Sequence, residues 1–459
     1  METQYSIFNT AKRIISDYTL CAECFGRQFA LLGTGLSNQE RANSILTTLL
    51  LEYNDLLNES QGNKDLFMKN LEKLQEIASK MNFKPAILLM KKFQPEWQDS
   101  TDKVCYLCNN FFQRVNSLVT TIINNAKDYE FENYLVGTSI NAKIVDKEDE
   151  FRAKLEINTG ESMKKNFNRV VGKKLEVIWG KFVEFKQPQL NIQISIDRDR
   201  YKVQVTSNPL CVKGRYRKLI RGIPQTHWPH KKCRGKGCEE CYFTGKQYPT
   251  SVEELISPEF LQSSRSDQSV FHGAGREDID ARCIGPGRPF IIELKEPRIR
   301  SIDLHRIQKE VNKKNGDKVE IFDLVFVPRS EIKNLKQSGE ATAKTYYVLI
   351  KSETKLTKRD FKCKLASIKK KILENPILQR TPLRVVHRRA DLTRKRMVYD
   401  IEFKWKNRYY FSSRIKAMGG TYIKELISGD EGRTKPSLSE LFGRNLRCAE
   451  LDIVNIEYR

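Results

Sequence analysis

Residues 273–282 read GAGREDIDAR, and residues 285–294 read GPGRPFIIEL. Carboxylates and arginines crowd a glycine-flanked segment that leads into an apolar run, which predicts a loop followed by a strand. Glycine permits unusual backbone angles, and neighbouring arginines favour the charged form of an aspartate. An aspartate in such a loop is a nucleophile, a metal ligand or an ion-paired residue, and the composition of the loop does not choose between them.

The sequence around this loop mixes strands and helices. Strands are expected at 288–294, 321–327 and 345–350, and helices at 302–313 and 361–373. Because strands and helices do not alternate strictly, a mixed or mostly antiparallel sheet is favoured over a doubly wound one. The region from 205 to 459 is therefore expected to be a single α+β domain.

The preceding part of the chain has a different character. Helices are expected at 37–53, 66–81 and 112–126, the first of them opened by a capping box at 37–40. After residue 130 we expect strands at 133–140, 174–179 and 190–205, the last being a strand pair turning near 197–200, with a helix at 161–172. Residues 1–204 thus form an accessory α+β region, and the whole chain belongs to the α+β class.

Composition limits the function. The chain has 459 residues, of which 39% are hydrophobic, so it is long enough for two or three packed domains. It has no run of about 18 apolar residues and no secretory leader pattern at its start, so neither a membrane span nor secretion is expected. A cytoplasmic protein with reduced thiols is expected, and metal binding by cysteines is then more common than disulfide formation.

The charge is concentrated in the second region. The net charge is +24, yet residues 1–204 hold 28 basic and 26 acidic side chains, a net of +2, while residues 205–459 hold 53 and 31, a net of +22. A polyanion such as RNA is the natural partner of that surface. The alternative is a basic surface with no partner.

Two CxxC pairs, Cys21/Cys24 and Cys105/Cys108, stand among the 11 cysteines. Each pair can supply two thiolates to one tetrahedral Zn²⁺, so together they predict a structural Cys₄ site that staples two distant segments. A redox CxxC is the competing interpretation.

A second group lies in a basic, glycine-rich insert at 227–241. His230, Cys233, Cys238 and Cys241 have the ligand types that zinc prefers, but their spacing is not a standard one. Whether they bind metal or are incidental thiols in an RNA-facing loop stays open.

A series of motifs resembles those of the archaeal and eukaryotic pseudouridine synthases that act on uridines 54 and 55 in the T loop of tRNA. The motifs cover most of the chain and are CAECFGR (21–27), LLGTGLSN (31–38), GRYRK (214–218), IPQT (223–226), SVEELI (251–256), GREDIDAR (275–282), GPGRPF (285–290), TPLRV (381–385), HRR (387–389), GTYIKEL (420–426) and GRTKPS (432–437). The resemblance implies a THUMP-like RNA-binding module in the first region and a pseudouridine synthase catalytic domain in the second. The insert at 227–241 resembles a feature of the archaeal members of this family.

The resemblance also implies roles for individual residues. Asp278 falls on the nucleophile, with Asp280 as the alternative, and Lys424 falls on the basic residue that pairs with the nucleophile. The residues implied at the substrate are Tyr346 stacking on the base, Leu426 beneath it, Tyr422 in the same motif, and Arg276 holding the flipped base out of the RNA. Tyr347 adjoins Tyr346 and competes for its role.

Plainer interpretations of the same residues exist. Tyr346 could be a core aromatic, Lys424 a solvated helix residue, and Arg276 an ion-pair partner of Glu277 or Asp280. His387-Arg388-Arg389 is either a phosphate-contacting patch or a basic turn.

The expected function is isomerisation of uridine to pseudouridine in the tRNA T arm, with structural zinc, no organic cofactor, no membrane and no obligate protein partner. Two other classes compete. One is a zinc-containing RNA-binding protein with a degenerate synthase domain. The other is a metal-dependent nuclease that uses Glu277, Asp278 and Asp280.

Overall fold

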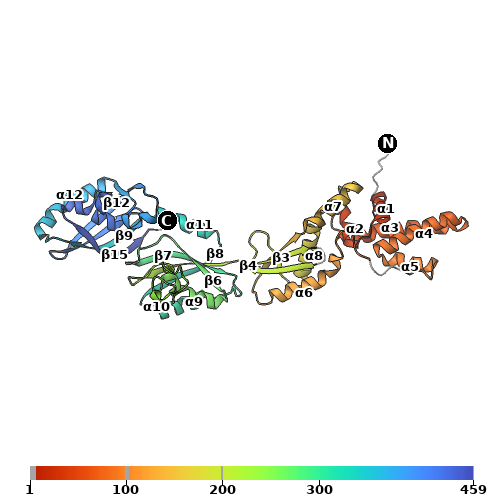
Figure 1. Cartoon of the computed structure of the whole chain (residues 1–459), viewed down its shortest axis with the longest axis horizontal. Coiled ribbons are helices and arrows are strands. Elements are labelled where there is room, and N and C mark those ends of the chain that lie inside the picture. The colour runs from red at the N-terminus through yellow and green to blue at the C-terminus, as the bar shows by residue number, and fades with distance from the viewer. Residues whose placement is uncertain (1–6, 99–102, 198–199, 458–459) are drawn as a thin grey trace. The chain divides into compact units, whose positions relative to one another are not determined.

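A computed structural model describes residues 7–98, 103–197 and 200–457, and the chain divides into two units, residues 1–208 and 209–459 (Figure 1). Strand β4 (Arg200–Ser207) pairs with β3 (Leu190–Asp197) up to Ser207, so a boundary after residue 204 would lie inside this strand. The residues 198–199 of the expected turn lie outside the described ranges. No described helix is both long enough and apolar enough to cross a membrane.

The first unit begins with helices. They are α1 (Ile7–Asp17), α2 (Ala22–Gly26), η1 (Arg27–Phe29), α3 (Asn38–Glu59), η2 (Ser60–Gly62), α4 (Lys64–Met81), α5 (Lys84–Phe93), η3 (Phe111–Arg114) and α6 (Val115–Ala126). The expected capping box opens α3, because the Ser37 hydroxyl accepts from the Glu40 amide and the Glu40 carboxylate accepts from the Ser37 amide.

A four-stranded sheet of order β2-β1-β3-β4 follows, with strands β1 (Asn133–Ile140) and β2 (Phe182–Val183) and helices α7 (Ala142–Leu155) and α8 (Met163–Trp179). The expected strand at 174–179 is wrong, because these residues are the end of α8. Phe167, Val171 and Leu175 recur every four residues and bury one helical face, whereas Val177 remains 85% exposed. The apolar residues at 174–179 resemble a short strand when they are read alone. The four-residue spacing of the buried side chains upstream shows that they continue the helix.

The second unit is built on an eight-stranded sheet of order β12-β13-β9-β15-β7-β5-β8, with β6 also paired to β7. Its strands are β5 (Leu210–Lys218), β6 (Gln268–Gly273), β7 (Ala281–Lys295), β8 (Val319–Val327), β9 (Lys344–Ser352), β12 (Val398–Trp405), β13 (Tyr410–Ala417) and β15 (Leu446–Ile456). All pairings are antiparallel except that of β7 with β15, which confirms the mixed, mostly antiparallel sheet.

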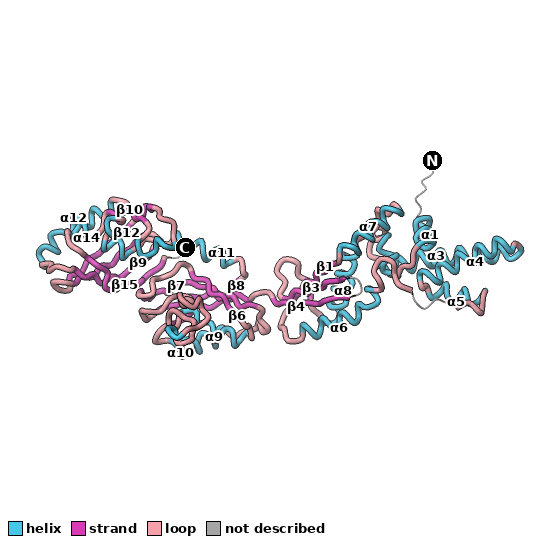
Figure 2. Tube along the Cα trace, in the orientation of Figure 1, coloured by secondary structure: helices cyan, strands magenta, loops and turns pink. Residues whose placement is uncertain are grey.

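Helices cover this sheet: α9 packs on β6, α10 on β8 and α12 on β12, and Figure 2 shows α9 beside β6 and α12 beside β12. The helices are α9 (Val252–Ser264), α10 (Leu304–Asn315), α11 (Glu331–Ala341), α12 (Lys358–Glu374), α13 (Ile423–Ser428) and α14 (Leu438–Phe442), with short η4 (Glu239–Cys241), η5 (Leu383–Arg388) and η6 (Asp430–Gly432). A small sheet of order β11-β10-β14 joins β10 (Ile377–Arg380), β11 (Thr393–Arg396) and β14 (Thr434–Lys435).

Strand β15 sits in the middle of the large sheet, between β9 and β7. Ile453 is opposite Tyr346 on β9 and opposite Cys283 on β7. The loop at 273–280 runs directly into β7 at Ala281. The order of strands therefore brings the acidic loop and Tyr346 to the same part of the sheet.

Candidate active site and metal centres

A cavity of about 850 Å³ opens beside the acidic loop. Five of the residues expected at the site line it: Arg276, Asp278, Tyr346, Tyr422 and Lys424. Its wall is strongly basic, since it also includes Arg288, Lys344, Arg384, Arg389, Arg394 and Arg396. Burial, aided by the charge of Arg288, lowers the pKa of Lys344 to about 8. A cavity of this charge suits an anionic ligand.

The acidic loop is anchored by a buried ion pair. Glu277 and Arg288 are almost fully buried, and the Arg288 Nε lies 2.8 Å from the Glu277 carboxylate. The Tyr216 hydroxyl donates to the same carboxylate at 2.9 Å, and Arg288 also donates to the Ala274 carbonyl at 2.8 Å. Glu277 is therefore a structural residue, and its neighbour Asp278 is turned toward the cavity.

A fully buried lysine holds the other side of the loop. The Lys218 Nζ donates to the carbonyls of Ile223, Asp278 and Ile279 at 2.9, 3.1 and 3.0 Å. Burial lowers the pKa of Lys218, and the three carbonyls supply the hydrogen bonds that a buried ammonium requires. The backbone of the candidate nucleophile is thus fixed from beneath.

Two cations face the Asp278 carboxylate. Arg384 approaches it through two guanidinium nitrogens, each at 3.2 Å, and the Lys424 Nζ lies 3.4 Å away. The same guanidinium donates through Nε to Glu425 at 2.7 Å. The sequence predicts Lys424 alone as the basic partner of Asp278. The structure adds Arg384, whose guanidinium contacts the Asp278 carboxylate through two nitrogens.

Lys424 contacts Asp280 more closely, at 2.6 and 2.7 Å. Burial opposes ionisation of Asp280, but the hydrogen bond and charge of Lys424 lower its pKa overall. The Asp280 side chain is 66% exposed and does not line the cavity, whereas Asp278 does. This geometry favours Asp278 as the reacting carboxylate.

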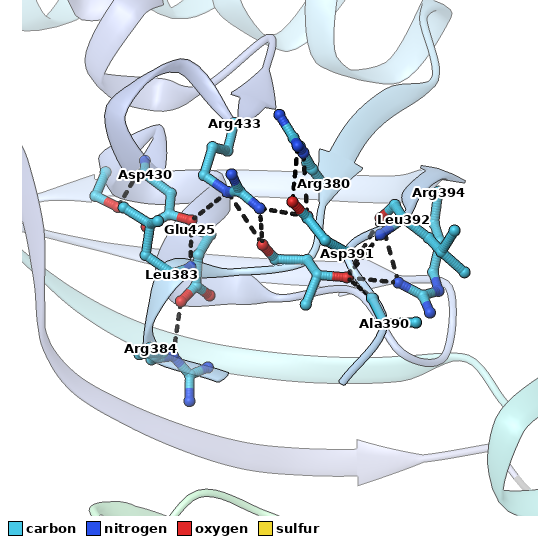
Figure 3. Close-up of polar contacts among 12 residues, drawn as sticks. Arg380, Leu383, Arg384, Ala390, Asp391, Leu392, Arg394, Glu425, Asp430 and Arg433 are labelled. Carbon is cyan, nitrogen blue, oxygen red and sulfur yellow. Dashed lines mark hydrogen bonds and ion pairs between the residues drawn. The ribbon is translucent and has the colours of Figure 1, made fainter. Parts of the chain in front are cut away.

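Arg384 is carried by the η5 segment, and the ends of that loop are tied together. Figure 3 shows Arg433 and Arg380 both directed at Asp391, and Arg394 directed at the start of the loop. Arg433 also donates to the Thr381 carbonyl at 2.7 Å, and the Asp430 carboxylate accepts from the Leu383 amide at 3.1 Å. The loop is therefore closed at its base, which fixes where Arg384 projects.

The aromatic residues divide between the faces of the sheet. Tyr346 is 7% exposed and lines the cavity, and burial raises its pKa to about 12, so its phenol stays protonated at neutral pH. Tyr347 points to the other side and is 38% exposed. The Tyr422 hydroxyl accepts from Arg389 at 2.8 Å at the cavity wall.

Leu426 is the one expected site residue that the structure does not bring to the cavity wall. It is fully buried in the core beneath α13. Apolar wall positions are instead occupied by Val385, Ile423, Leu451 and Ile453. Ile423 lies one helical turn before Leu426, so α13 contributes Ile423 to the cavity wall in place of Leu426.

Arg276 lies over the ring of Trp228, with its guanidinium carbon 5.5 Å from the ring centroid. Arg276 thus contacts an aromatic residue of the insert, while the Glu277 carboxylate accepts from Arg288 and Tyr216. Among the described residues, Glu277, Asp278 and Asp280 do not form a group whose ligand atoms converge as a nuclease metal site would require.

The four cysteines expected to bind zinc in the first unit do converge. Cys21, at the start of α2, and Cys24, within it, meet Cys105 and Cys108, with all ligand atoms within 4.8 Å of one another. Cys21 Sγ and Cys108 Sγ are 3.7 Å apart. Asn110 supports the second pair by accepting from the Cys105 amide at 2.9 Å and donating to the Lys103 carbonyl at 3.0 Å. Four converging thiols, three of them buried and Cys21 half-buried, suit a structural zinc ion.

The second group, His230, Cys233, Cys238 and Cys241, also converges within 4.8 Å. These two clusters are the metal-competent groups found among the described residues. The spacing in the sequence left this second group undecided, and the fold brings its ligands together.

Two residues of the site were missed in the sequence. Arg384 lies inside the quoted TPLRV motif and Lys218 at the end of GRYRK, so both were marked by motif but had no role. Their partners, at separations of 106 and 60 residues for Asp278, become visible only in the folded chain.

Comparison with known proteins agrees with the geometry. Residues 211–457 match the family described as "Pus10, C-terminal", and residues 118–197 match "Pus10 THUMP domain, archaeal". The chain is 40% identical over 446 residues to "tRNA pseudouridine synthase Pus10" of Methanocaldococcus jannaschii, which covers 96% of this chain and 93% of the relative. It is 35% identical over 452 residues to the protein of the same name from Methanothrix thermoacetophila, with 98% and 94% covered. The chain therefore belongs to the Pus10 family.

Proposed function

We propose that this chain is a tRNA pseudouridine synthase that isomerises uridines 54 and 55 in the T arm, with Asp278 as its nucleophile. One observation carries the assignment of the residue: Asp278 lines a basic cavity shared with Tyr346, and its carboxylate faces both Arg384 and Lys424. The family membership supports the reaction, since the relatives are named tRNA pseudouridine synthases.

The reaction needs few groups. The N1–C1′ bond of uridine breaks, the uracil turns, and a C5–C1′ bond forms, while the C5 proton is lost and N1 gains one. There is no net redox change, so no organic cofactor is required. Asp278 acts at the sugar, either by attack on C1′ or by removal of a sugar proton, and the bound RNA, by covering the cavity, limits the access of water to the intermediate.

The surrounding residues serve that step. Tyr346 stacks on the uracil, and Tyr422 and Ile423 form further wall. Arg384 and Lys424 orient the carboxylate and balance its charge. Arg276 contacts the RNA as the base is flipped, a rearrangement that costs a few kcal/mol.

Phosphate contacts offset that cost. The second unit carries a net charge of +22 over residues 205–459, from 53 basic and 31 acidic side chains. The THUMP-like module at 118–197 grips the tRNA body, and the T arm enters the cavity. Cys21, Cys24, Cys105 and Cys108 hold a structural zinc ion in a cytoplasmic enzyme.

The test uses unmodified tRNA transcript and the zinc-loaded full chain in the presence of a mild chelator. Wild type should form pseudouridine at 54 and 55, Asp278→Asn should form none, and Asp280→Asn should retain activity. Product from Asp278→Asn would overturn the nucleophile assignment. Loss of activity with Asp280→Asn alone would transfer the role to Asp280.

Wild type that binds tRNA but forms no pseudouridine on any transcript would identify a degenerate synthase that acts as a binding protein. RNA cleavage that requires added divalent ions would identify a nuclease. Both outcomes contradict the proposal. Binding is read by filter binding, and cleavage in a parallel reaction with divalent ions in place of the chelator.

A further inference from the structure

The insert between β5 and α9 forms a small loop structure, here called the knuckle and defined as residues 227–248. We propose that His230, Cys233, Cys238 and Cys241 of the knuckle bind a second structural zinc ion, and that this ion holds Trp228 against Arg276 at the wall of the cavity. The first half concerns metal alone. The second half rests on the proposed function, because it assigns the knuckle a part in binding RNA.

The ligand atoms have the separations of a tetrahedral zinc site. With Zn–S near 2.3 Å and Zn–N near 2.0–2.1 Å, tetrahedral angles place two sulfurs about 3.8 Å apart and a sulfur and nitrogen about 3.6 Å apart. The Cys233 and Cys238 sulfurs lie 3.9 and 3.7 Å from Cys241 Sγ, and 3.6 and 3.5 Å from His230 Nδ1. Four of the six ligand pairs therefore have the separations of a tetrahedral zinc site, and the other two lie within 4.8 Å.

The backbone around Cys241 is arranged for a thiolate. The Cys238 amide lies 3.2 Å and the Gly245 amide 3.3 Å from Cys241 Sγ, and both donate to it. Gly245 has a φ of +69°, and a Cβ there would collide with the Gly235 carbonyl. Amides directed at one sulfur stabilise the charged form that a metal ligand must adopt.

The knuckle has almost no hydrophobic core to hold it. Between residues 226 and 250, all of which the structure describes, only Cys241 and Gly245 are buried. Its large apolar side chains point outward, with Tyr242 and Phe243 88% and 73% exposed. A segment that buries so little apolar surface needs another source of stability, and a four-ligand metal site is the usual one in small folds.

The metal cluster is connected to the cavity through Trp228. Trp228 lies two residues before His230, and its carbonyl accepts from the Gln247 amide at 2.9 Å, while the His230 amide donates to Gly245 at 2.7 Å. Tyr248 packs edge-on against Trp228, with ring centroids 5.7 Å apart. The Trp228 ring also meets Arg276, which lies two residues from Asp278. Fixing the four ligands thus fixes the aromatic surface on which Arg276 rests.

Metal analysis of the purified full chain tests the first half. We expect two zinc ions in wild type, and one in Cys238→Ser and in His230→Ala. Two matched controls should keep both ions: His227→Ala removes a histidine from the same segment, and Cys363→Ser removes an exposed cysteine of α12. His230→Cys should also keep both, because four thiolates satisfy zinc, and this variant shows that loss in His230→Ala is not general unfolding. One zinc in wild type, or two in Cys238→Ser, overturns the site.

A double-mutant cycle tests the second half, with the dissociation constant of unmodified tRNA as the readout. Loss of a cation–π contact predicts about three- to tenfold weaker binding by Cys238→Ser and by Arg276→Ala. The double variant should bind no more than twofold weaker than Arg276→Ala, because the zinc acts through Arg276. The positioning role is overturned if the losses of affinity in the two single variants multiply in the double variant. It is also overturned if Cys238→Ser binds tRNA as wild type does.

The two proposals fail separately. The zinc count does not depend on turnover, and tRNA binding is measured without it. If wild type forms no pseudouridine but the zinc counts and the double-mutant cycle behave as expected, the proposed enzymatic function is wrong and the proposal for the knuckle is supported.

Discussion

Replacing Arg384 by methionine tests whether its guanidinium serves Asp278. Methionine keeps much of the side-chain volume but removes the contacts to Asp278 at 3.2 Å and to Glu425 at 2.7 Å. A hydrogen bond to a charged group contributes about 1.5–3 kcal/mol. Because both Arg384 and Asp278 side chains are more than a third exposed, we reduce this to about 1–2 kcal/mol. At about 1.4 kcal/mol per factor of ten, kcat should fall about five- to thirtyfold.

The same change has a second, separable effect on stability. Glu425 is 4% exposed, and its Oε2 makes no hydrogen bond within the described part of the chain, so loss of Arg384 leaves a buried carboxylate without its strongest partner. We expect a loss of about 1–3 kcal/mol and a Tm lower by several degrees. The double variant Arg384→Met/Glu425→Gln should recover much of the Tm without recovering kcat.

Steady-state rates over a range of tRNA transcript concentrations, which give kcat and KM, provide the assay together with thermal melts. Arg282→Met is the matched control, because Arg282 is 40% exposed and pairs with the buried Asp452 but does not line the cavity. Its kcat should stay within about twofold of wild type. If Arg384→Met changes only KM, or if the double variant regains kcat, then Arg384 acts on RNA or on folding, and the reasoning from its fork to Asp278 is refuted.

Four shorter predictions follow from other parts of the molecule. Burial opposes ionisation of Glu293, yet Lys295, His272 and Arg329 lower its pKa to about 2. The stability that this carboxylate contributes is therefore present above about pH 4.5 and is lost as the pH falls toward 2. The urea midpoint of Glu293→Gln should depend less on pH in that window than the midpoint of wild type does. Burial raises the pKa of Tyr346 to about 12, so wild type should lose stability relative to Tyr346→Phe as the pH rises from about 10 to 12, and equal pH profiles would contradict this. Cys105→Ser should lose one zinc and melt at lower temperature, while Cys211→Ser, at a buried cysteine outside both clusters, should keep its full zinc content. Arg389→Ala should weaken tRNA binding and reduce the slope of log Kd against log salt by about one, as measured by filter binding, if this residue contacts a phosphate.

The local parts of the fold were readable in the sequence, because short-range interactions determine them. The capping box at Ser37 and Glu40 and the strand pair after residue 190 form as their patterns indicate. The end of α8 was misjudged, because a short apolar run without its upstream context fits strand and helix equally.

The sequence predicts only those residues of the candidate site that lie in recognised motifs and are given a role by them. Asp278, Tyr346 and Lys424 converge on one cavity. The contacts of Arg384 and Lys218 cannot be foreseen from the sequence. The first depends on where the fold places η5 relative to Asp278, and the second on backbone carbonyls that no sequence pattern reveals. Leu426 and Ile423 lie one turn apart on α13, and which of them faces the cavity depends on how that helix packs.

The central position of β15 has a consequence for the order in which the protein is made. Every other strand of the large sheet leaves the ribosome before β15 does, yet β15 is the strand that joins β9 to β7. Until residues 446–456 have emerged, Tyr346 and the acidic loop belong to two separate halves with unpaired edges. We therefore expect a chain that lacks this strand to be inactive and prone to aggregate through those edges.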